Sequence, residues 1–518
     1  MRITNKIMQN NSLSNINANK VYQDKLSTQM STQKKISKAS DDPVVAIRAL
    51  RLRSSVTEIT QYYSKNIPDA ESWLDVTEDA LENLTSIITD MITQCTKGAN
   101  GDLTTEDREI ILEQLKALGD EVYSTANADY AGRYVFAGYR TDTPISFTSA
   151  STDNYTITEI IDSSAIDEVT HINTGDLLDI NSSNYSTYDS LSETDISSVS
   201  VNRIRLAYDN CNADSVPVIS YTSRDADGNL VDSQFTTTAV MNSYDKSADG
   251  EDPYTYAANN PDAVVYVPDT GELLLGENVY NELMATKDEA STSDNEAMIQ
   301  VTYEKNDWEE GDLRPEHYYY CKNNTTGIEY NEDYLSGDGE TQIIEYDVGF
   351  NQTIRVNSTA SECFKTGIGR EVSDIVNAMQ ELANIETVMG NIESMLEDES
   401  LSDDDKEILE AQLDAAEKAY TLAKDKCQEA FESGITAFQG YLDDANLCIT
   451  DTGTRSKKLE LIESRMQSQK TTFETLKSEN EDIDITEVAI QLTSAELTYE
   501  AALMATSKIM QTSLLNFI

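Results

Sequence analysis

The feature that most constrains this chain is a run of apolar residues spaced alternately four and three positions apart. In the first part of the chain this heptad run comprises Val56, Thr60, Tyr63, Ile67, Ala70, Leu74, Thr77, Leu81, Leu84, Ile88, Met91 and Cys95. The spacing places these side chains on one face of a helix and is typical of a coiled coil. Pro68 lies within the run, where it removes a backbone donor, so we expect a kink or a break there.

The same pattern returns near the other end of the sequence. Three further runs comprise Val372, Ile375, Met379, Leu382, Met389 and Leu396; Leu409, Leu413, Ala416, Tyr420, Ala423, Cys427, Ala430, Gly434, Ala437 and Tyr441; and Leu459, Ile462, Met466, Phe473, Leu476 and Ile483. Thr104 with Asp107, and Ser402 with Asp405, have the spacing of helix N-caps. Long helical segments on two separated arms indicate that the arms pack against each other and that the residues between them are an insertion.

The stretch between the arms has the character of β-structure. Residues 263–267 and 272–276 are apolar apart from Glu272 and flank a Pro-Asp-Thr-Gly turn, which predicts a hairpin. Residues 343–350 and 352–357 predict a second strand pair. We therefore predict a mainly α protein with an inserted β-rich region, its long terminal helices packed as an antiparallel coiled-coil bundle. The predicted domains are 1–42 with 484–518 (terminal assembly domain), 43–147 with 362–483 (arm domain) and 148–361 (acidic β-rich insertion).

Both ends of the chain carry a narrow apolar stripe. We predict an assembly interface made by Ile3, Ile7, Leu13, Ile16, Leu26, Met30, Leu492, Tyr499, Leu503, Met510, Leu514 and Phe517. Isolated amphipathic helices are marginal in water, so we expect these ends to be disordered in the free chain and to order on partners. The alternative is that they form an ordinary helix pair in the core of the arm.

Charge narrows the classes of function. The 93 acidic residues against 38 Lys and Arg give a net charge of −55, which disfavours nucleic acid and anionic membranes as partners. The charge is uneven, because residues 151–360 contain 41 acidic and nine basic residues, whereas residues 1–60 contain ten basic and four acidic ones. No stretch has the length and apolarity of a membrane span. The first residues lack the apolar segment of a secretory signal peptide, so we expect a chain that stays in the cytoplasm or leaves by a route that cleaves no signal.

Sites for chemistry are poorly supported. The two histidines, His171 and His317, form no metalloprotease motif, and no phosphate-binding or nucleophile-elbow motif occurs. Residues 225–229 have part of a calcium-loop pattern but lack its later ligands, so a hairpin turn is favoured. Tyr318-Tyr319-Tyr320 is interpreted as part of an exposed strand or as packing rather than as a sugar-binding platform. The six cysteines form no CxxC pair and are interpreted as semi-buried thiols, with disulfides left open.

Several segments resemble the flagellin family of bacterial axial proteins. The opening residues 1–16, the Ser-Asp-Asp-Pro segment at 40–43, the Tyr-Val-Phe-Ala-Gly-Tyr-Arg segment at 134–140 and residues 494–518 carry the resemblance. It covers roughly 1–147 and 362–518 and is strongest to the subunits that join hook and filament. Within it, Asp42 is positioned to cap a helix that begins at Pro43.

The resemblance implies a structural, non-enzymatic subunit without a cofactor, exported unfolded through the flagellar type III apparatus. Its implied place is the extracellular hook–filament junction, after a transient stay in the cytoplasm. Its implied partners are the first hook-associated protein, flagellin, further copies of itself in a ring, and a cytoplasmic export chaperone on the C-terminal helix. The alternatives are a flagellin filament subunit, a flagellin-like protein that displays an adhesin or glycan-binding insertion, and, last, a hydrolase.

Overall fold

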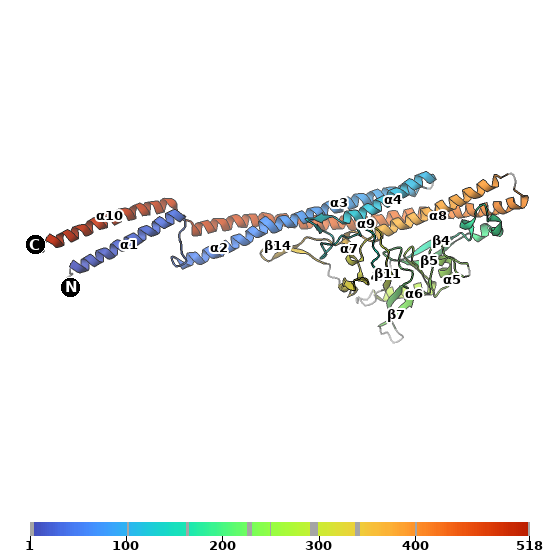
Figure 1. Ribbon diagram of the computed structural model, residues 1–518, viewed down its shortest axis with the longest axis horizontal. Coiled ribbons are helices and arrows are strands. Elements are labelled where there is room, and N and C mark those ends of the chain that lie inside the picture. The colour runs from blue at the N-terminus through green and yellow to red at the C-terminus, as the bar shows by residue number, and fades with distance from the viewer. Residues whose placement is uncertain are drawn as a thin grey trace. The chain divides into compact units, whose positions relative to one another are not determined.

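The computed structural model describes residues 5–100, 103–161, 165–224, 230–248, 250–290, 299–336, 342–398 and 401–515. The chain divides into two compact units. Unit 1 comprises Met1–Glu71, Tyr346–Ile354 and Ser456–Ile518, and unit 2 comprises Ser72–Glu345 and Arg355–Arg455. The described part is mostly helical with a β-rich insertion, as the sequence predicts (Figure 1).

The long helices come from the two ends of the sequence, and the longest of those described, α9, has 79 residues. They are α1 (Asn5–Thr32), α2 (Pro43–Gln61), α3 (Ile67–Gly98), α4 (Thr105–Ala126), α8 (Gly367–Leu396), α9 (Asp403–Glu481) and α10 (Ile485–Leu515), with the short α5 (Pro253–Asn259), α6 (Glu277–Ala290) and α7 (Ala360–Cys363) in and after the insertion. The predicted N-caps are confirmed: Thr104 accepts from the Asp107 amide, and Ser402 accepts from the Asp405 amide. The predicted run from Leu409 to Tyr441 and the run from Leu459 to Leu476 belong to one helix, α9. Ile483, assigned to the last run, lies in the connection between α9 and α10.

The heptad prediction for α3 is confirmed by burial. All the predicted positions from Ile67 to Cys95 are buried. In α8 the prediction is correct up to Leu382 and wrong beyond it, because the buried residues there are Ile385, Val388 and Ile392 rather than Met389 and Leu396. Both sets are apolar, so the neighbouring helices, and not the spacing, decide which set is covered. Leu476, assigned to the last run, is 44% exposed.

Pro68 does not break the helix. A five-residue π-helical turn, Tyr62–Asn66, connects α2 to α3, and Pro68 is the second residue of α3. A π-turn is a recognised way to accommodate a residue that cannot make the regular α-helical hydrogen bond. The expected interruption is therefore a local change of helix type.

The insertion contains two larger sheets. A five-stranded sheet has the order β4-β5-β10-β9-β8, and a six-stranded sheet has the order β13-β12-β3-β11-β6-β7. Neighbouring strands are antiparallel except β8 and β9. The strands are β3 (Tyr155–Ile161), β4 (Ile166–Asn173), β5 (Ser197–Arg205), β6 (Val218–Arg224), β7 (Leu230–Thr236), β8 (Ala239–Val240), β9 (Val264–Val267), β10 (Glu272–Leu275), β11 (Ile299–Lys305), β12 (Tyr320–Asn323) and β13 (Ile328–Tyr330), with two-stranded pairs β1 (Asp129–Tyr130) with β2 (Arg133–Tyr134) and β14 (Glu345–Gly349) with β15 (Gln352–Arg355).

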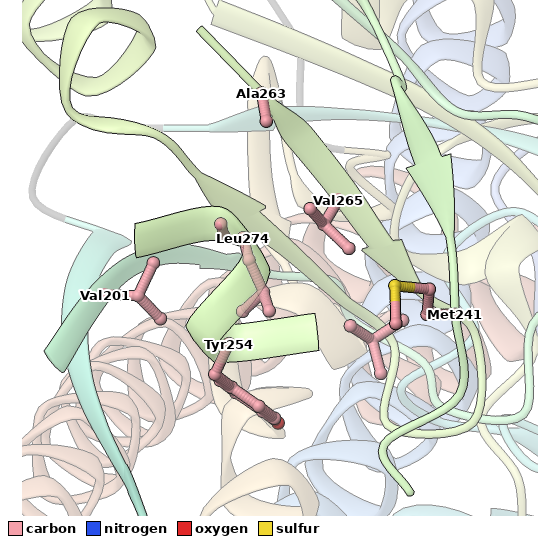
Figure 2. Close-up of a cluster of buried hydrophobic side chains, with 8 residues drawn as sticks. Val201, Met241, Tyr254, Ala263, Val265 and Leu274 are labelled. Carbon is pink, nitrogen blue, oxygen red and sulfur yellow. The ribbon is translucent and has the colours of Figure 1, made fainter. Parts of the chain in front are cut away.

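Both predicted strand pairs are present. The β9–β10 hairpin lies inside the five-stranded sheet, and every residue of both strands is buried, which explains why all of them except Glu272 are apolar. Gly271 closes the turn with φ of +65°, a conformation that favours glycine. Figure 2 shows the core beside this hairpin. Val265 and Leu274 of the hairpin pack there with Val201 of β5, with Tyr254 of α5 and with Met241, which follows β8.

The insertion is joined to α8 within unit 2 by ion pairs. Arg203 of β5 bonds Asp374 of α8 at 2.7 Å, and Arg205 bonds the same carboxylate at 2.8 Å. Arg205 also pairs with Glu371, and Arg203 with Glu272. The two guanidinium groups are largely buried, and each has carboxylate partners, so the ion pairs hold the sheet against α8.

Candidate assembly surface

Helices α1 and α10 lie side by side in unit 1 (Figure 1). Leu26 of α1 packs with Val488 and Ala495 of α10, and Ile483 and Leu492 lie against this cluster. Because the end of α1 meets the start of α10, the two helices run antiparallel. The expectation that the ends are disordered in the free chain therefore differs from the structure, in which each helix covers part of the apolar stripe of the other.

A polar cluster lies where α1 leads into α2 and α9 leads into α10. The buried carboxylate of Glu481 accepts two bonds from Arg53, at 2.6 and 2.7 Å, and Lys34 lies 3.6 Å from it. The bond from Arg53 lowers the pKa of Glu481. Lys35 donates its amide to the Glu481 carbonyl at 2.8 Å, so one residue binds three others that are more than four hundred positions away.

The structure divides the predicted interface residues into two groups. In the first group, Leu26 is buried, and Ile16, Leu492 and Tyr499 are half-buried. Leu26 and Leu492 belong to the α1–α10 cluster. Ile7, Leu13, Met30 and Leu503 remain exposed, at 50%, 55%, 37% and 43%. Ile3 and Phe517 lie outside the described residues, as do the side chains of Met510 and Leu514 in α10.

Other apolar side chains, outside the predicted interface set, are also exposed. On the terminal pair they are Met8, Val21, Tyr22, Ile485, Ile490, Leu497 and Met504, and on α2 they are Val44, Ile47 and Leu50. Ile485 continues the face of Val488 and Leu492, whereas Ile490, Leu497 and Met504 recur every seven residues on another face of α10. A count of all apolar positions on α1 and α10 would have signalled more apolar surface than one helix contact can cover.

Asp42 and Pro43 lie at the start of α2. The Asp42 carboxylate accepts from the amides of Val44 and Val45 at 3.0 and 3.2 Å, and Pro43 is the first residue of the helix. The cap fixes the residue at which the connection from α1 becomes helical.

The side chains considered for chemistry pack in the interior. His171 stacks on Tyr254 at 4.2 Å, and burial lowers the pKa of His317 to about 4. Tyr318 is buried, and the Tyr319 hydroxyl bonds Thr366 at 2.8 Å, in agreement with a packing role. The partial calcium-loop pattern at 225–229 lies outside the described residues.

Within the part of the chain that the structure describes, no group of three or more His, Cys, Asp or Glu side chains is arranged to hold a metal ion. Among the described helices, none combines the length and the apolarity needed to cross a membrane.

Comparison with known proteins identifies the class of the N-terminal part. Residues 3–141 match the bacterial flagellin N-terminal helical region. This part of the chain, which contains α1 to α4, β1 and β2, is similar to that region.

The named relatives are more specific. Flagellar hook-associated protein 3 of Salmonella typhimurium is 32% identical over 143 residues, which is 27% of this chain and 45% of the relative. Flagellin of Clostridium tyrobutyricum is 31% identical over 127 residues, which is 24% of this chain and 33% of the relative. The chain thus matches less than half the length of these relatives. The resemblance to the flagellin family and to its third hook-associated protein is confirmed over this part of the chain.

A solved structure adds a remote likeness. The flagellar hook-associated protein 3 of Legionella pneumophila aligns over 82% of this chain and 96% of its own, with 11% identity and a TM-score of 0.28.

Proposed function

We propose that this chain is a structural subunit of the bacterial flagellum that joins the hook to the filament and assembles through α1 and α10. The observation that carries the proposal is the exposed apolar surface of that helix pair, on a chain whose named relatives are flagellar proteins. Full burial of a large apolar side chain contributes about 1.5–3 kcal/mol, so this surface provides a substantial drive toward association.

The proposed assembly is an antiparallel coiled-coil bundle of terminal helices, completed by neighbouring subunits. Leu13 and Leu497 are 55% and 69% exposed, and a second copy or a related subunit would cover them. In this proposal residues 1–42 with 484–518 form the assembly domain, 43–147 with 362–483 form the arm domain, and 148–361 form the insertion.

The proposed partners are the first hook-associated protein, flagellin and further copies of this chain in a ring. Before export through the type III route, a cytoplasmic chaperone would cover the apolar face of α10. The proposed final location is the extracellular junction, and the proposed role is packing, not catalysis. The acidic insertion would face solvent, where its charge opposes unwanted lateral contacts.

The test is deletion of the gene followed by electron microscopy of hooks on the cell surface. We expect hooks without filaments and filament subunit lost to the medium. Complementation with Leu13→Gln or Leu497→Gln should fail to restore filaments, whereas the adjacent exposed controls Ser14→Gln and Thr498→Gln should restore them. Normal filaments after deletion would refute the proposal.

The flagellin relative supports a second candidate, a filament subunit. The same deletion distinguishes the two. Loss of a filament subunit removes the filament and leaves no filament protein in the medium, whereas loss of the junction subunit releases it.

A further inference from the structure

Two cysteines that are distant in the sequence lie side by side in unit 2. Cys363 is the last residue of α7, and Cys448 lies in the middle of α9. The Cys448 thiol donates to the carbonyl of Glu362, the residue before Cys363, at 3.7 Å. This contact brings the Cys448 sulfur next to Cys363, and the two thiols interact with each other.

We infer that Cys363 and Cys448 form a disulfide on exposure to an oxidant, and that this bond ties the segment following the insertion to the long helix α9. Both residues are reduced in the structure. The inference rests on the 3.7 Å contact of the Cys448 thiol with the carbonyl of the residue before Cys363 and on the unequal exposure of the two cysteines, and it is independent of the proposed flagellar function.

The environment assigns different parts to the two sulfurs. Cys363 is 2% exposed, whereas Cys448 is half-buried, so a reagent reaches Cys448 first. The hydrogen bond from Cys363 lowers the pKa of the Cys448 thiol, and the same bond, together with burial, raises the pKa of the Cys363 thiol. A thiolate is the nucleophile in disulfide exchange, so Cys448 is the attacking residue and Cys363 the resolving one.

The reaction balances with a low-molecular-weight disulfide such as oxidised glutathione as the oxidant. The Cys448 thiolate attacks one sulfur of glutathione disulfide, forms a mixed disulfide and releases one glutathione thiolate, which takes up the proton that Cys448 lost. Cys363 then loses its proton and attacks the Cys448 sulfur, which forms the protein disulfide and releases the second glutathione. Two cysteine thiols are oxidised, and one glutathione disulfide is reduced to two thiols.

The other four cysteines provide an internal comparison. Cys95, Cys211, Cys321 and Cys427 are buried, and burial raises the pKa of each thiol, to about 11 for Cys427 and about 12 for Cys95. Thiols of this kind react slowly. Cys427 is the best matched control because it lies on the same helix as Cys448.

The experiment treats the folded full chain with oxidised glutathione and then counts free thiols after denaturation in acid. We expect two of the six thiols to be lost, a peptide containing Cys363 linked to one containing Cys448 in the mass spectrum, and full reversal by dithiothreitol. The oxidised chain should also melt at a higher temperature than the reduced one, since the bond closes a long loop.

Variants decide the assignment. Cys448→Ala should abolish both glutathionylation and the cross-link. Cys363→Ala should stop at the mixed disulfide on Cys448, and Cys427→Ala should still lose two thiols. Circular dichroism checks that each variant is folded. The inference is overturned if all six thiols survive in the wild-type chain, if Cys448 stops at the mixed disulfide although Cys363 is present, or if the cross-link joins two chains.

Discussion

The ion pairs between the insertion and α8 permit a quantitative prediction. The Asp374 carboxylate bonds Arg203 and Arg205, and its side chain is 23% exposed. Burial alone would raise its pKa, but the neighbouring guanidinium groups, first that of Arg203, outweigh burial and lower the pKa of Asp374 to about 2 from an ordinary 3.8. At about 1.4 kcal/mol for each tenfold change in proton affinity, the ionised carboxylate contributes about 2.5 kcal/mol to stability.

The sign of the pH dependence follows from the direction of the shift. Because the pKa is lower in the folded chain, the contribution is complete well above pH 3.8 and is lost as the pH falls toward 2. At pH 3 about half of it remains. Asparagine is a neutral near-isostere of the protonated acid, so Asp374→Asn should destabilise unit 2 by about 2.5 kcal/mol at pH 7 and by about half as much at pH 3.

Urea unfolding followed by tryptophan fluorescence measures this effect. Both tryptophans of the chain, Trp73 and Trp308, are buried in unit 2 and therefore report on its unfolding. Asp443→Asn, an exposed acid on α9, is the control and should change stability by less than about 0.5 kcal/mol. The reasoning is wrong if wild type and Asp374→Asn have the same free energy of unfolding at pH 7, or if their free energies differ by the same amount at pH 7 and pH 3.

Three further predictions concern packing and caps. Leu26→Ala should cost about 2–5 kcal/mol in the α1–α10 contact and speed proteolysis of both ends, whereas Ser27→Ala, next to it and exposed, should leave the digestion rate unchanged. Asp42→Ala should lower stability by about 1 kcal/mol in thermal unfolding, and Asp42→Ser should recover most of it; equal melting of the two variants would contradict the capping role. A Cβ added at Gly98 would overlap the ring of Phe431, so Gly98→Ala should destabilise the chain by about 1–3 kcal/mol. Gly453 in α9 has open space around it, so Gly453→Ala should stabilise the chain by up to about 1 kcal/mol. A Gly98→Ala chain more stable to urea than the Gly453→Ala chain would refute this packing.

The local elements could be read from the sequence where one signal dominated. The heptad run from Ile67 to Cys95 and the β9–β10 hairpin were predicted because spacing and turn residues specify them without reference to distant parts of the chain. Prediction was wrong in α8 after Leu382, where two apolar sets compete and only the neighbouring helices select one. Apolar periodicity also could not predict that Leu26 is covered while Leu13 is exposed, since both residues belong to the same predicted stripe.

The sequence by itself determined that the chain has long helices at both ends, a β-rich acidic insertion between them and a flagellin-like N-terminal region, because these follow from period, composition and local motif. Only the tertiary structure decided which distant residues meet. It brings Arg203 to Asp374, Arg53 to Glu481 and Cys363 to Cys448. The physical reason is that helix and strand formation depends on neighbours within a few positions, whereas pairing of charges, thiols and apolar faces depends on distances in space that no local pattern encodes.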